Sequence, residues 1–383
     1  MPRAGANTAW ARRVLFVQAT EPAGYPPLIH AATLMAEAGW EVTFLSAPIA
    51  GNRLQLPPHP RISLRATAPR PSHVMGKAAY LRYVAAAARL ALGLRPAVVY
   101  ASDPLGAWPG TLAARLAGAR LVYHEHDSPQ PGAMRPWLAQ RRRAAARSAD
   151  IVVFPNAARA RLAQAELGFA ADRLRVVWNL PRRGELPLLP ARPDKPLVLY
   201  YHGNVSPNLV PEAAAAGVRQ LAGRVRLRIV GREAPGAAGY VRHLLGPGLG
   251  GSLKCGISYV GQVPRADLLN VAATAHVGLA LMPGKTDDVN LRHMTGASNK
   301  PFDYMAAGLA LLVSDLPDWR DMFVRPGYAR PCDPADPNSV AAALRWFLDH
   351  PHERRAMAAR ARARIEAEWN YETAFAPVLA ALA

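Results

Sequence analysis

The chain has 383 residues, enough for two domains of ordinary size, each with its own hydrophobic core. Hydrophobic residues make up 51% of the sequence and the mean hydropathy is -0.01, which excludes a largely disordered chain. The 46 Lys and Arg residues outnumber the 27 Asp and Glu residues, and the net charge of +19 predicts an anionic partner.

The first half of the chain alternates between buried strands and helices. We expect strands at 14–18, 41–46, 97–101, 121–124, 151–154 and 176–177, with helices at 28–38, 80–92, 108–117 and 136–148. This alternation indicates α/β layers with parallel sheets.

Residues 181–196 hold five prolines and no hydrophobic period, a composition typical of a linker. A second series follows, with strands at 197–201, 227–230, 257–260, 277–281 and 309–314 and helices at 339–348 and 352–369. We therefore expect two doubly wound, Rossmann-like α/β domains, residues 1–185 and 196–365, facing a central cleft. The last segment, 366–383, is expected to be a helix that packs back on the first domain. Ligands bind beyond the carboxyl ends of such strands.

The segment 298–315 carries the strongest functional signal. Ser298 or Asn299 suits a helix N-cap, Gly308 suits the left-handed residue that ends the helix, and a buried strand follows. The start of such a helix attracts phosphate, and Lys300 adds a full positive charge there. Asp303 lies about one turn further along, where a carboxylate can hold a ribose hydroxyl. Together these residues predict a sugar-nucleotide site.

This segment resembles the donor-binding motif of GT-B glycosyltransferases, in the retaining group often called family 4. There the pattern runs Asn-Lys, two apolar residues, then Glu-Tyr-Met-Ala-Ala-Gly. The resemblance implies a GT-B fold and transfer of a sugar from a nucleotide-diphospho-sugar with retained configuration. The sequence has no Asp-x-Asp motif to hold Mg²⁺, so we expect metal-independent transfer and no cofactor besides the donor substrate.

The same resemblance assigns further donor-binding positions. They follow strands or lie in the glycine loop of the first domain: Gly24, Gly203, Asn204, Gly231, Arg232 and Val263. On its residues alone, Gly24 is equally an ordinary turn beside Tyr25 and Pro26. The basic pair that follows the glycine in the family is missing after Gly203. Lys300 and then Lys285 or Arg292 are candidates to replace its charge.

The family also spaces two glutamates eight positions apart. Asp303 occupies the second position, but Thr295 stands at the first and cannot replace a carboxylate. An inactive or accessory GT-B protein is the alternative that this departure leaves open.

In the first domain, the segment 123–127 (YHEHD) ends a predicted strand. The resemblance implies that His126 faces the transferred sugar and that Asp127 supports the loop. A histidine with a near-neutral pKa can hold a proton during transfer. Ser102 and Asp103 end the preceding strand, where either a structural role or acceptor contact fits. A metal site or a solvated loop is the other interpretation of 123–127.

The basic charge is concentrated before residue 191, where 24 Lys and Arg face 10 Asp and Glu. The helix at 136–148 carries Arg141, Arg142 and Arg143 beside Trp137, a combination that suits an anionic membrane surface. A solvated helix face is the alternative.

We expect a cytosolic, peripheral membrane glycosyltransferase acting on a lipid-linked or polysaccharide acceptor. Residues 1–10 lack the apolar core of a signal peptide, and the cysteines Cys255 and Cys332 suggest neither a disulfide framework nor a metal site. A GT-B sugar-nucleotide epimerase and an Arg-rich nucleic-acid-binding protein are the alternative functions. The sequence has no recognised nucleic-acid-binding motif.

Overall fold

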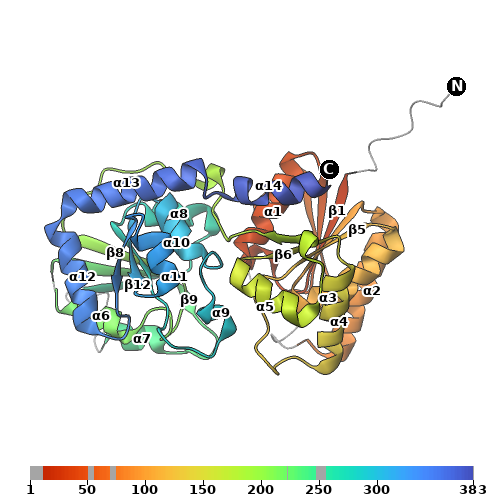
Figure 1. The fold of residues 1–383 in the computed structure, drawn as a ribbon, viewed down its shortest axis with the longest axis horizontal. Helices are drawn as coiled ribbons and strands as arrows, with labels where there is room; N and C mark the ends of the chain where they lie inside the picture. The colour runs from red at the N-terminus through yellow and green to blue at the C-terminus, as the bar shows by residue number, and fades with distance from the viewer. Residues whose placement is uncertain (1–11, 51–55, 70–74, 222, 247–255, 383) are drawn as a thin grey trace. The chain divides into compact units, whose positions relative to one another are not determined.

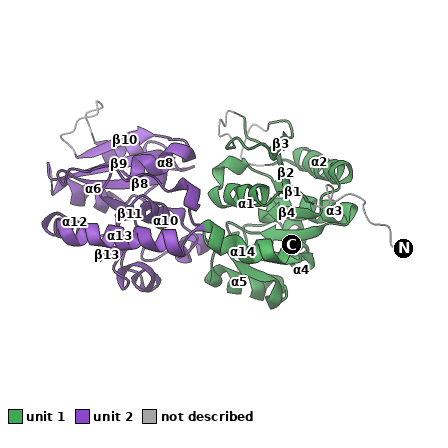
Figure 2. Ribbon diagram, turned by 90° about the horizontal axis from the view of Figure 1, so that it is seen from above, with its two compact units in different colours: residues 1–179, 371–383 green, residues 180–370 purple. Residues whose placement is uncertain are grey.

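The computed structural model describes residues 12–50, 56–69, 75–221, 223–246 and 256–382. The chain forms two compact units (Figure 2). Residues 1–179 and 371–383 make up the first unit, and residues 180–370 make up the second. The residues of the predicted linker therefore belong to the second unit. Residues 1–10, where no signal peptide was expected, and Cys255 lie outside the described residues.

The described part of the first unit contains a parallel sheet of seven strands in the order β3-β2-β1-β4-β5-β6-β7. The strands are β1 (Arg13–Gln18), β2 (Glu41–Ser46), β3 (Ile62–Ala66), β4 (Val98–Ser102), β5 (Arg120–His124), β6 (Ile151–Phe154) and β7 (Leu174–Val176). The helices are η2 (Pro22–Gly24), α1 (Pro26–Glu37), α2 (Lys77–Leu94), α3 (Asp103–Ala117), α4 (Pro136–Ser148), α5 (Ala157–Leu167), η3 (Ala171–Arg173) and α14 (Tyr371–Leu382).

Helices cover both faces of this first sheet. One core joins Leu15, Val17 and Val99 to apolar side chains of α2, α3, α4 and α5. On the other face, α14 contacts α1 and β7 (Figure 1). Strand order reverses at β1, between β2 and β4, which makes the carboxyl ends of β1 and β4 a topological switch point.

The described part of the second unit has a parallel six-stranded sheet in the order β10-β9-β8-β11-β12-β13. The strands are β8 (Leu197–Val205), β9 (Val225–Glu233), β10 (Ile257–Gly261), β11 (Val277–Ala280), β12 (Ala310–Ser314) and β13 (Ala329–Cys332). The helices are η4 (Arg183–Glu185), α6 (Glu212–Arg219), α7 (Tyr240–Leu245), α8 (Arg265–Ala272), α9 (Val289–Arg292), α10 (Asn299–Ala306), α11 (Pro317–Trp319), η6 (Arg320–Val324), α12 (Pro337–Asp349) and α13 (Pro351–Ala367).

The second sheet is also covered by helices on both faces. Helices α6, α7 and α12 contribute to one core, and α10 and α13 pack against each other and against β12. Its switch point lies between β8 and β11. The predicted class, two doubly wound parallel-sheet domains, is confirmed. Gly308 has a φ of +68°, as expected for the residue that ends α10.

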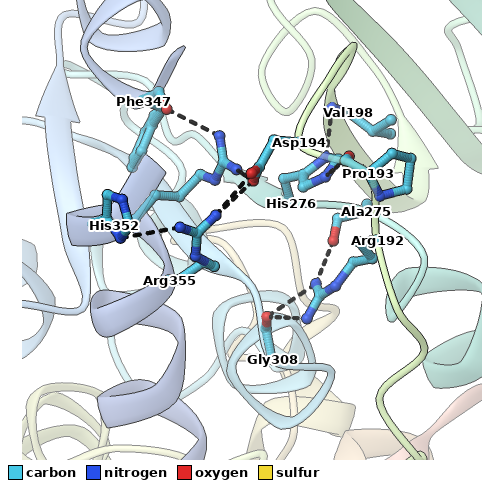
Figure 3. Close-up of polar contacts among 11 residues, drawn as sticks. Arg192, Pro193, Asp194, Val198, Ala275, His276, Gly308, Phe347, His352 and Arg355 are labelled. Carbon is cyan, nitrogen blue, oxygen red and sulfur yellow. Dashed lines mark hydrogen bonds and ion pairs between the residues drawn. The ribbon is translucent and has the colours of Figure 1, made fainter. Parts of the chain in front are cut away.

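The proline-rich segment before β8, residues 181–196, forms hydrogen bonds with other parts of the second unit (Figure 3). Arg192 donates to the carbonyls of Gly308 and Ala275. His276 donates from Nε2 to the Pro193 carbonyl at 2.9 Å, and Arg355 donates to both oxygens of Asp194. The segment with linker composition therefore has a defined structure as part of the second unit.

Two sequence predictions of local structure were wrong. Strands β8 and β9 continue through Gly203 and Gly231 as a paired ladder to Val205 and Glu233, where we expected loops. Helix α3 begins at Asp103, because that residue adopts a left-handed φ of 59° and turns the chain directly into the helix. Gly24 lies in the single turn η2, directly before Tyr25, and is exposed, which fits the ordinary turn that the sequence left open for it.

None of the described helices is long and apolar enough to cross a bilayer. Cys332 is a free, buried thiol. Among the described residues there is no group of three or more His, Cys, Asp and Glu side chains placed to hold a metal ion.

Candidate functional site

The N-terminus of α10 forms the centre of the donor-side site in the second unit. Ser298 is the N-cap residue, but its side chain makes no capping hydrogen bond. The Ser298 hydroxyl and the Asn299 side-chain amide nitrogen are buried and have no partner among the described residues. Because the first backbone N–H groups of a helix have no intrahelical acceptor, this end of α10 offers several donors to an anion.

Lys300 supplies the cation at this end of α10. Its ammonium lies 5.7 Å from the centroid of the Tyr201 ring. Its Cε would lie 2.9 Å from a Cβ atom added to Gly203, so the lysine stem covers the glycine. Burial lowers the pKa of Lys300 to about 8. A desolvated ammonium next to free helix N–H groups is suited to bind a phosphate group.

Two glycines allow the strands β8 and β9 to approach closely at this edge. Gly203 and Gly231 are paired in register, with φ of +121° and +136°. A Cβ on Gly231 would lie 1.9 Å from the Gly203 carbonyl oxygen, which excludes any other residue there. Asn204 and Arg232 follow the glycines, and both side chains are exposed.

Asp303 lies in a buried charged cluster rather than on an open surface. Only 1% of the residue is exposed. Arg265 donates from Nη1 to Oδ2 at 2.6 Å and from Nη2 to Oδ1 at 2.9 Å. His202 Nε2 lies 3.2 Å from Oδ2. Burial opposes ionisation, but Arg265 and His202 hold the pKa of Asp303 below its usual value.

The same arginine also binds the segment before β8. Arg265 Nε donates to Glu185 Oε1 at 2.8 Å and Nη2 donates to Oε2 at 3.1 Å. Burial opposes the charge on Arg265, yet Asp303 and Glu185 together raise its pKa. Sequence reasoning missed Glu185, Arg265 and His202. The only available signals were a histidine at the end of a strand and an arginine at the start of a helix.

The other donor-side candidates are more peripheral. Arg292 donates to the Thr286 carbonyl and is exposed, and Lys285 is exposed as well. Val263 lies between β10 and α8, two residues before Arg265. Thr295 is partly buried in the segment between α9 and α10. Of the three candidate replacement cations, Lys300 is the one that packs on Gly203.

His126 follows β5 in the first unit and is 4% exposed. Its ring lies 3.8 Å from the ring of His124 and 5.6 Å from that of Tyr25, centroid to centroid. Its backbone N–H donates to Asp103 Oδ1 at 2.8 Å. Burial lowers the pKa of His126 to about 3, so the side chain is uncharged at physiological pH. The sequence had suggested a pKa close to neutrality.

The end of β4 lies beside this histidine. Burial, and then the charge of Asp127, raise the pKa of Asp103 to about 8. Ser102, Gln18 and His124 are register neighbours on β4, β1 and β5, and each has a buried polar atom without a partner among the described residues. Such a row can bind hydroxyl groups or water. Asp127 is exposed and lies 3.7 Å from Arg159.

The expected membrane-facing role of Arg142 is wrong. Its side chain is 3% exposed and donates to both oxygens of Glu125, at 2.6 and 2.7 Å, and to Glu166. The arginine is buried because α4 packs this side of the helix onto the sheet, where the buried carboxylate of Glu125 needs a cation.

The other predicted residues of α4 face solvent. Arg141 and Arg143 are exposed, and Trp137 is 42% exposed. The Arg141 guanidinium lies 5.0 Å from the centroid of the Trp108 ring. The buried Tyr80 ring contacts both Trp108 and Trp137, so Arg141 and the two tryptophans lie together where α2, α3 and α4 meet.

Two family models match the chain. Residues 28–179 match a glycosyl transferase 4-like domain, and residues 212–380 match a glycosyl transferase-like family. No curated protein sequence matches the chain.

Solved structures share the fold over nearly the whole length. Sucrose-phosphate synthase from Thermosynechococcus elongatus has a TM-score of 0.69 and 16% identity, covering 96% of this chain and 98% of its own. Anabaena HepE, in complex with UDP and glucose, has a TM-score of 0.68 and 16% identity over 97% and 99% of the two chains. WaaG, described as a glycosyltransferase involved in lipopolysaccharide biosynthesis, has a TM-score of 0.63 and 15% identity over 96% and 98%.

The two family matches cover most of both units, and the two parallel sheets have the architecture of these structures. The chain therefore belongs to the GT-B glycosyltransferases, as a family 4-like member.

Proposed function

We propose that this glycosyltransferase takes its sugar from a nucleotide-diphospho-sugar and binds the diphosphate at the N-terminus of α10. The observation that carries this proposal is the combination of Lys300, packed on Gly203, with the uncapped donors of Ser298 and Asn299. Anabaena HepE, which shares the fold, was solved with UDP and glucose and with UDP-glucose.

The chemistry requires stabilisation of the departing diphosphate. The bond between the sugar's anomeric carbon and the phosphate oxygen breaks, and a bond to an acceptor hydroxyl oxygen forms. The acceptor proton passes to the leaving phosphate or to solvent. Lys300 and the N–H groups of α10 place positive charge where negative charge develops. Transfer with retained configuration and without a metal ion follows from the family resemblance.

On the first unit, we propose that His126 contacts the sugar as a neutral hydrogen-bonding group, with Asp127 supporting its loop. Ser102 and Asp103 lie beside it and suit an acceptor hydroxyl. The acceptor itself is proposed to be a lipid-linked or polysaccharide precursor, because WaaG, which shares the fold, is involved in lipopolysaccharide biosynthesis.

The surface formed by Trp137, Trp108 and Arg141, together with the exposed Arg143 of the same helix, supports a peripheral membrane location for such an enzyme. Aromatic rings sit well at the headgroup level, and exposed arginines attract anionic lipids. The proposed compartment is the cytoplasm, at the inner face of the cell membrane.

A panel of UDP, GDP, ADP, CMP and dTDP with their sugars, measured by thermal shift and calorimetry, tests the donor proposal. We expect one nucleoside diphosphate to stabilise the protein clearly more than the others. Product analysis with the preferred donor then distinguishes transfer from epimerisation. If no nucleoside diphosphate stabilises the protein, the proposed donor site is overturned. DNA binding that depends steeply on salt concentration would favour the nucleic-acid alternative.

A further inference from the structure

We propose that Nδ1 of His202 accepts a hydrogen bond from the nucleoside part of the donor, from a ribose hydroxyl or a base N–H. This inference rests on the proposed donor site at α10. It adds a residue whose orientation and proton position are fixed by neighbouring side chains, with Asp303 in direct contact and Arg265 behind it.

The position of the proton on His202 follows from its one polar partner. Nε2 lies 3.2 Å from Asp303 Oδ2, and the imidazole is otherwise packed against the rings of Tyr304 and Tyr200. Burial lowers the pKa of His202, although Asp303 opposes this shift, so the ring carries a single proton. An ionised carboxylate can only accept, and the proton must therefore be on Nε2. Nδ1 is left as a bare acceptor.

The Asp303 carboxylate is itself held in place. Arg265 engages both of its oxygens and also both oxygens of Glu185, so the guanidinium bridges the two acids. The His202 backbone is fixed too, because its N–H donates to the Tyr304 hydroxyl at 3.0 Å. A hydrogen-bonding partner that orients an imidazole and selects its tautomer makes the opposite nitrogen a directional acceptor.

His202 Nδ1 is buried and has no hydrogen-bond partner among the described residues. Leaving a buried acceptor unsatisfied is unfavourable, so the native protein must supply a donor from a ligand or from an ordered water. His202 directly precedes Gly203, which the Lys300 side chain covers. The acceptor thus lies at the same end of β8 as the proposed diphosphate site. Along the strand, His202 is adjacent to the residue that Lys300 contacts.

The charge arrangement also indicates which part of the donor His202 meets. A phosphate oxygen can only accept, so it cannot satisfy a bare imidazole nitrogen. Hydroxyl and N–H groups of the nucleoside can. A diphosphate bound by Lys300 and the α10 N–H groups would leave the nucleoside as the neighbouring part able to donate.

Two substitutions separate the two nitrogens of His202. In His202→Asn, the side-chain oxygen can take the place of Nδ1, while the contact to Asp303 is lost. In His202→Gln, the amide can reach Asp303 in place of Nε2, while the acceptor at Nδ1 is lost. Calorimetry would compare binding of the preferred nucleoside diphosphate and of inorganic pyrophosphate to wild type and both variants, with melting temperatures as a check on folding.

We expect His202→Gln to weaken nucleoside diphosphate binding about tenfold, the scale of one hydrogen bond, and to leave pyrophosphate binding within about twofold. His202→Asn should retain most of the nucleoside diphosphate affinity. If a ribose hydroxyl donates the hydrogen bond, removing the 2′- or 3′-hydroxyl from the ligand should weaken its binding to wild type. The same removal should not weaken binding to His202→Gln any further. If neither deoxy ligand shows this pattern, a base N–H is the donor.

Unchanged affinity in a folded His202→Gln protein would show that an ordered water satisfies Nδ1 and would overturn the inference. Equal losses for pyrophosphate and nucleoside diphosphate would also overturn it, because the residue would then act through the phosphate site. If wild type binds none of the nucleoside diphosphates in the panel, the proposed donor site fails, and this inference fails with it.

Discussion

Arg265 binds Asp303 through two parallel hydrogen bonds, Nη1 to Oδ2 at 2.6 Å and Nη2 to Oδ1 at 2.9 Å. The carboxylate predicted to hold the ribose is therefore already engaged, and it is almost completely buried. Arg265 and His202 occupy three of the roughly four acceptor positions of this carboxylate, which leaves little capacity for a ribose hydroxyl. In the arrangement that we propose, Asp303 acts on the nucleoside through His202.

The first prediction concerns this pair. Asp303→Asn keeps the side-chain shape but leaves Arg265 with Glu185 alone. Breaking a buried ion pair costs about 3–5 kcal/mol, and we expect the low end of this range because Arg265 keeps one partner. Urea unfolding measures the loss. Asp321→Asn, which breaks the exposed pair with Arg325, is the control and should change stability little.

The same variant has a ligand-binding signature. An amide at position 303 can donate to His202, which would move the imidazole proton to Nδ1 and remove the acceptor. Nucleoside diphosphate affinity should therefore fall more than pyrophosphate affinity. Equal losses for the two ligands would assign Asp303 to the helix or to the phosphate site instead.

The elements best predicted from sequence are those with strong local signals. Helix α4, at 136–148, and strand β6, at 151–154, were predicted at their observed bounds. The helix start near Ser298 and the left-handed Gly308 of α10 also follow from local chemistry. In contrast, β3 has mostly exposed residues, and β13 contains Pro331, so neither shows a buried apolar run.

The charged cluster could not be predicted, because its partners are far apart along the chain. Arg265 lies 80 residues from Glu185 and 38 from Asp303. Tertiary packing alone brings them together. Arg142 shows the same limit, since a run of three arginines gives no local sign of which one will find Glu125.

The second prediction concerns the pH dependence of Lys300. Its pKa is lowered to about 8, and only the ammonium form attracts phosphate. Affinity for the preferred nucleoside diphosphate should be greatest below pH 8 and should fall as the pH rises through this value, by up to about tenfold per unit. A bound anion favours the ammonium and raises the pKa of Lys300 in the complex, so the fall begins near pH 8 and continues to higher pH.

Calorimetry of wild type and variants from about pH 7 to about pH 9, roughly one unit either side of that pKa, checks this prediction. Lys300→Ala should weaken binding by about 1.5–3 kcal/mol at pH 7.5 and remove the pH dependence. The exposed Lys285 is a matched control, and Lys285→Ala should behave like wild type. A Lys300→Ala protein that is folded and binds normally would refute the role of this lysine.

The third prediction separates the arginines of α4. Arg141→Gln with Arg143→Gln should reduce binding to anionic vesicles without loss of stability, because both side chains are exposed. Binding should be reversible and should disappear at high salt. Arg142→Gln should instead cost about 3–5 kcal/mol of stability, since it leaves Glu125 as a buried unpaired charge.

Vesicle sedimentation and urea unfolding provide the two readouts. Arg226→Gln with Arg345→Gln removes the same charge from exposed positions of the second unit and should leave vesicle binding unchanged. If this control reduces binding as strongly, net charge rather than the α4 surface is responsible. Binding that is equal for neutral and anionic vesicles would contradict the electrostatic account.

The fourth prediction concerns the glycine pair. In Gly231→Ala, the new Cβ would meet the Gly203 carbonyl at 1.9 Å, and the residue would have to keep a φ of +136°. We expect a loss of at least about 2 kcal/mol in stability, because backbone strain and overpacking add. Gly284→Ala is the control, since its Cβ would meet no atom within 4 Å. Equal unfolding midpoints for the two variants would show that β8 and β9 can move apart at Gly231 with little loss of stability.

The last prediction is that His126 matters for turnover more than for donor binding. The proposed nucleotide residues belong to the second unit, whereas His126 lies in the first unit, held by Asp103 and packed against His124. Because its pKa is lowered to about 3, it is neutral at physiological pH and cannot serve as an imidazolium acid. It can stabilise the transferring sugar through hydrogen bonds that tighten in the transition state.

Removing such a contact should lower kcat about 10²–10³-fold with little change in nucleotide affinity. Steady-state kinetics and calorimetry on His126→Ala measure the two quantities, with the exposed His352→Ala as a control for histidine removal. His126→Gln should recover part of the activity, because a neutral amide retains hydrogen-bonding capacity. An ordinary histidine ionises near pH 6.5. Because His126 does not, the kcat–pH profiles of wild type and His126→Gln should have the same shape around that pH. Normal turnover in His126→Ala would make this histidine part of the packing around β5, and an equal loss in binding and turnover would indicate a folding defect.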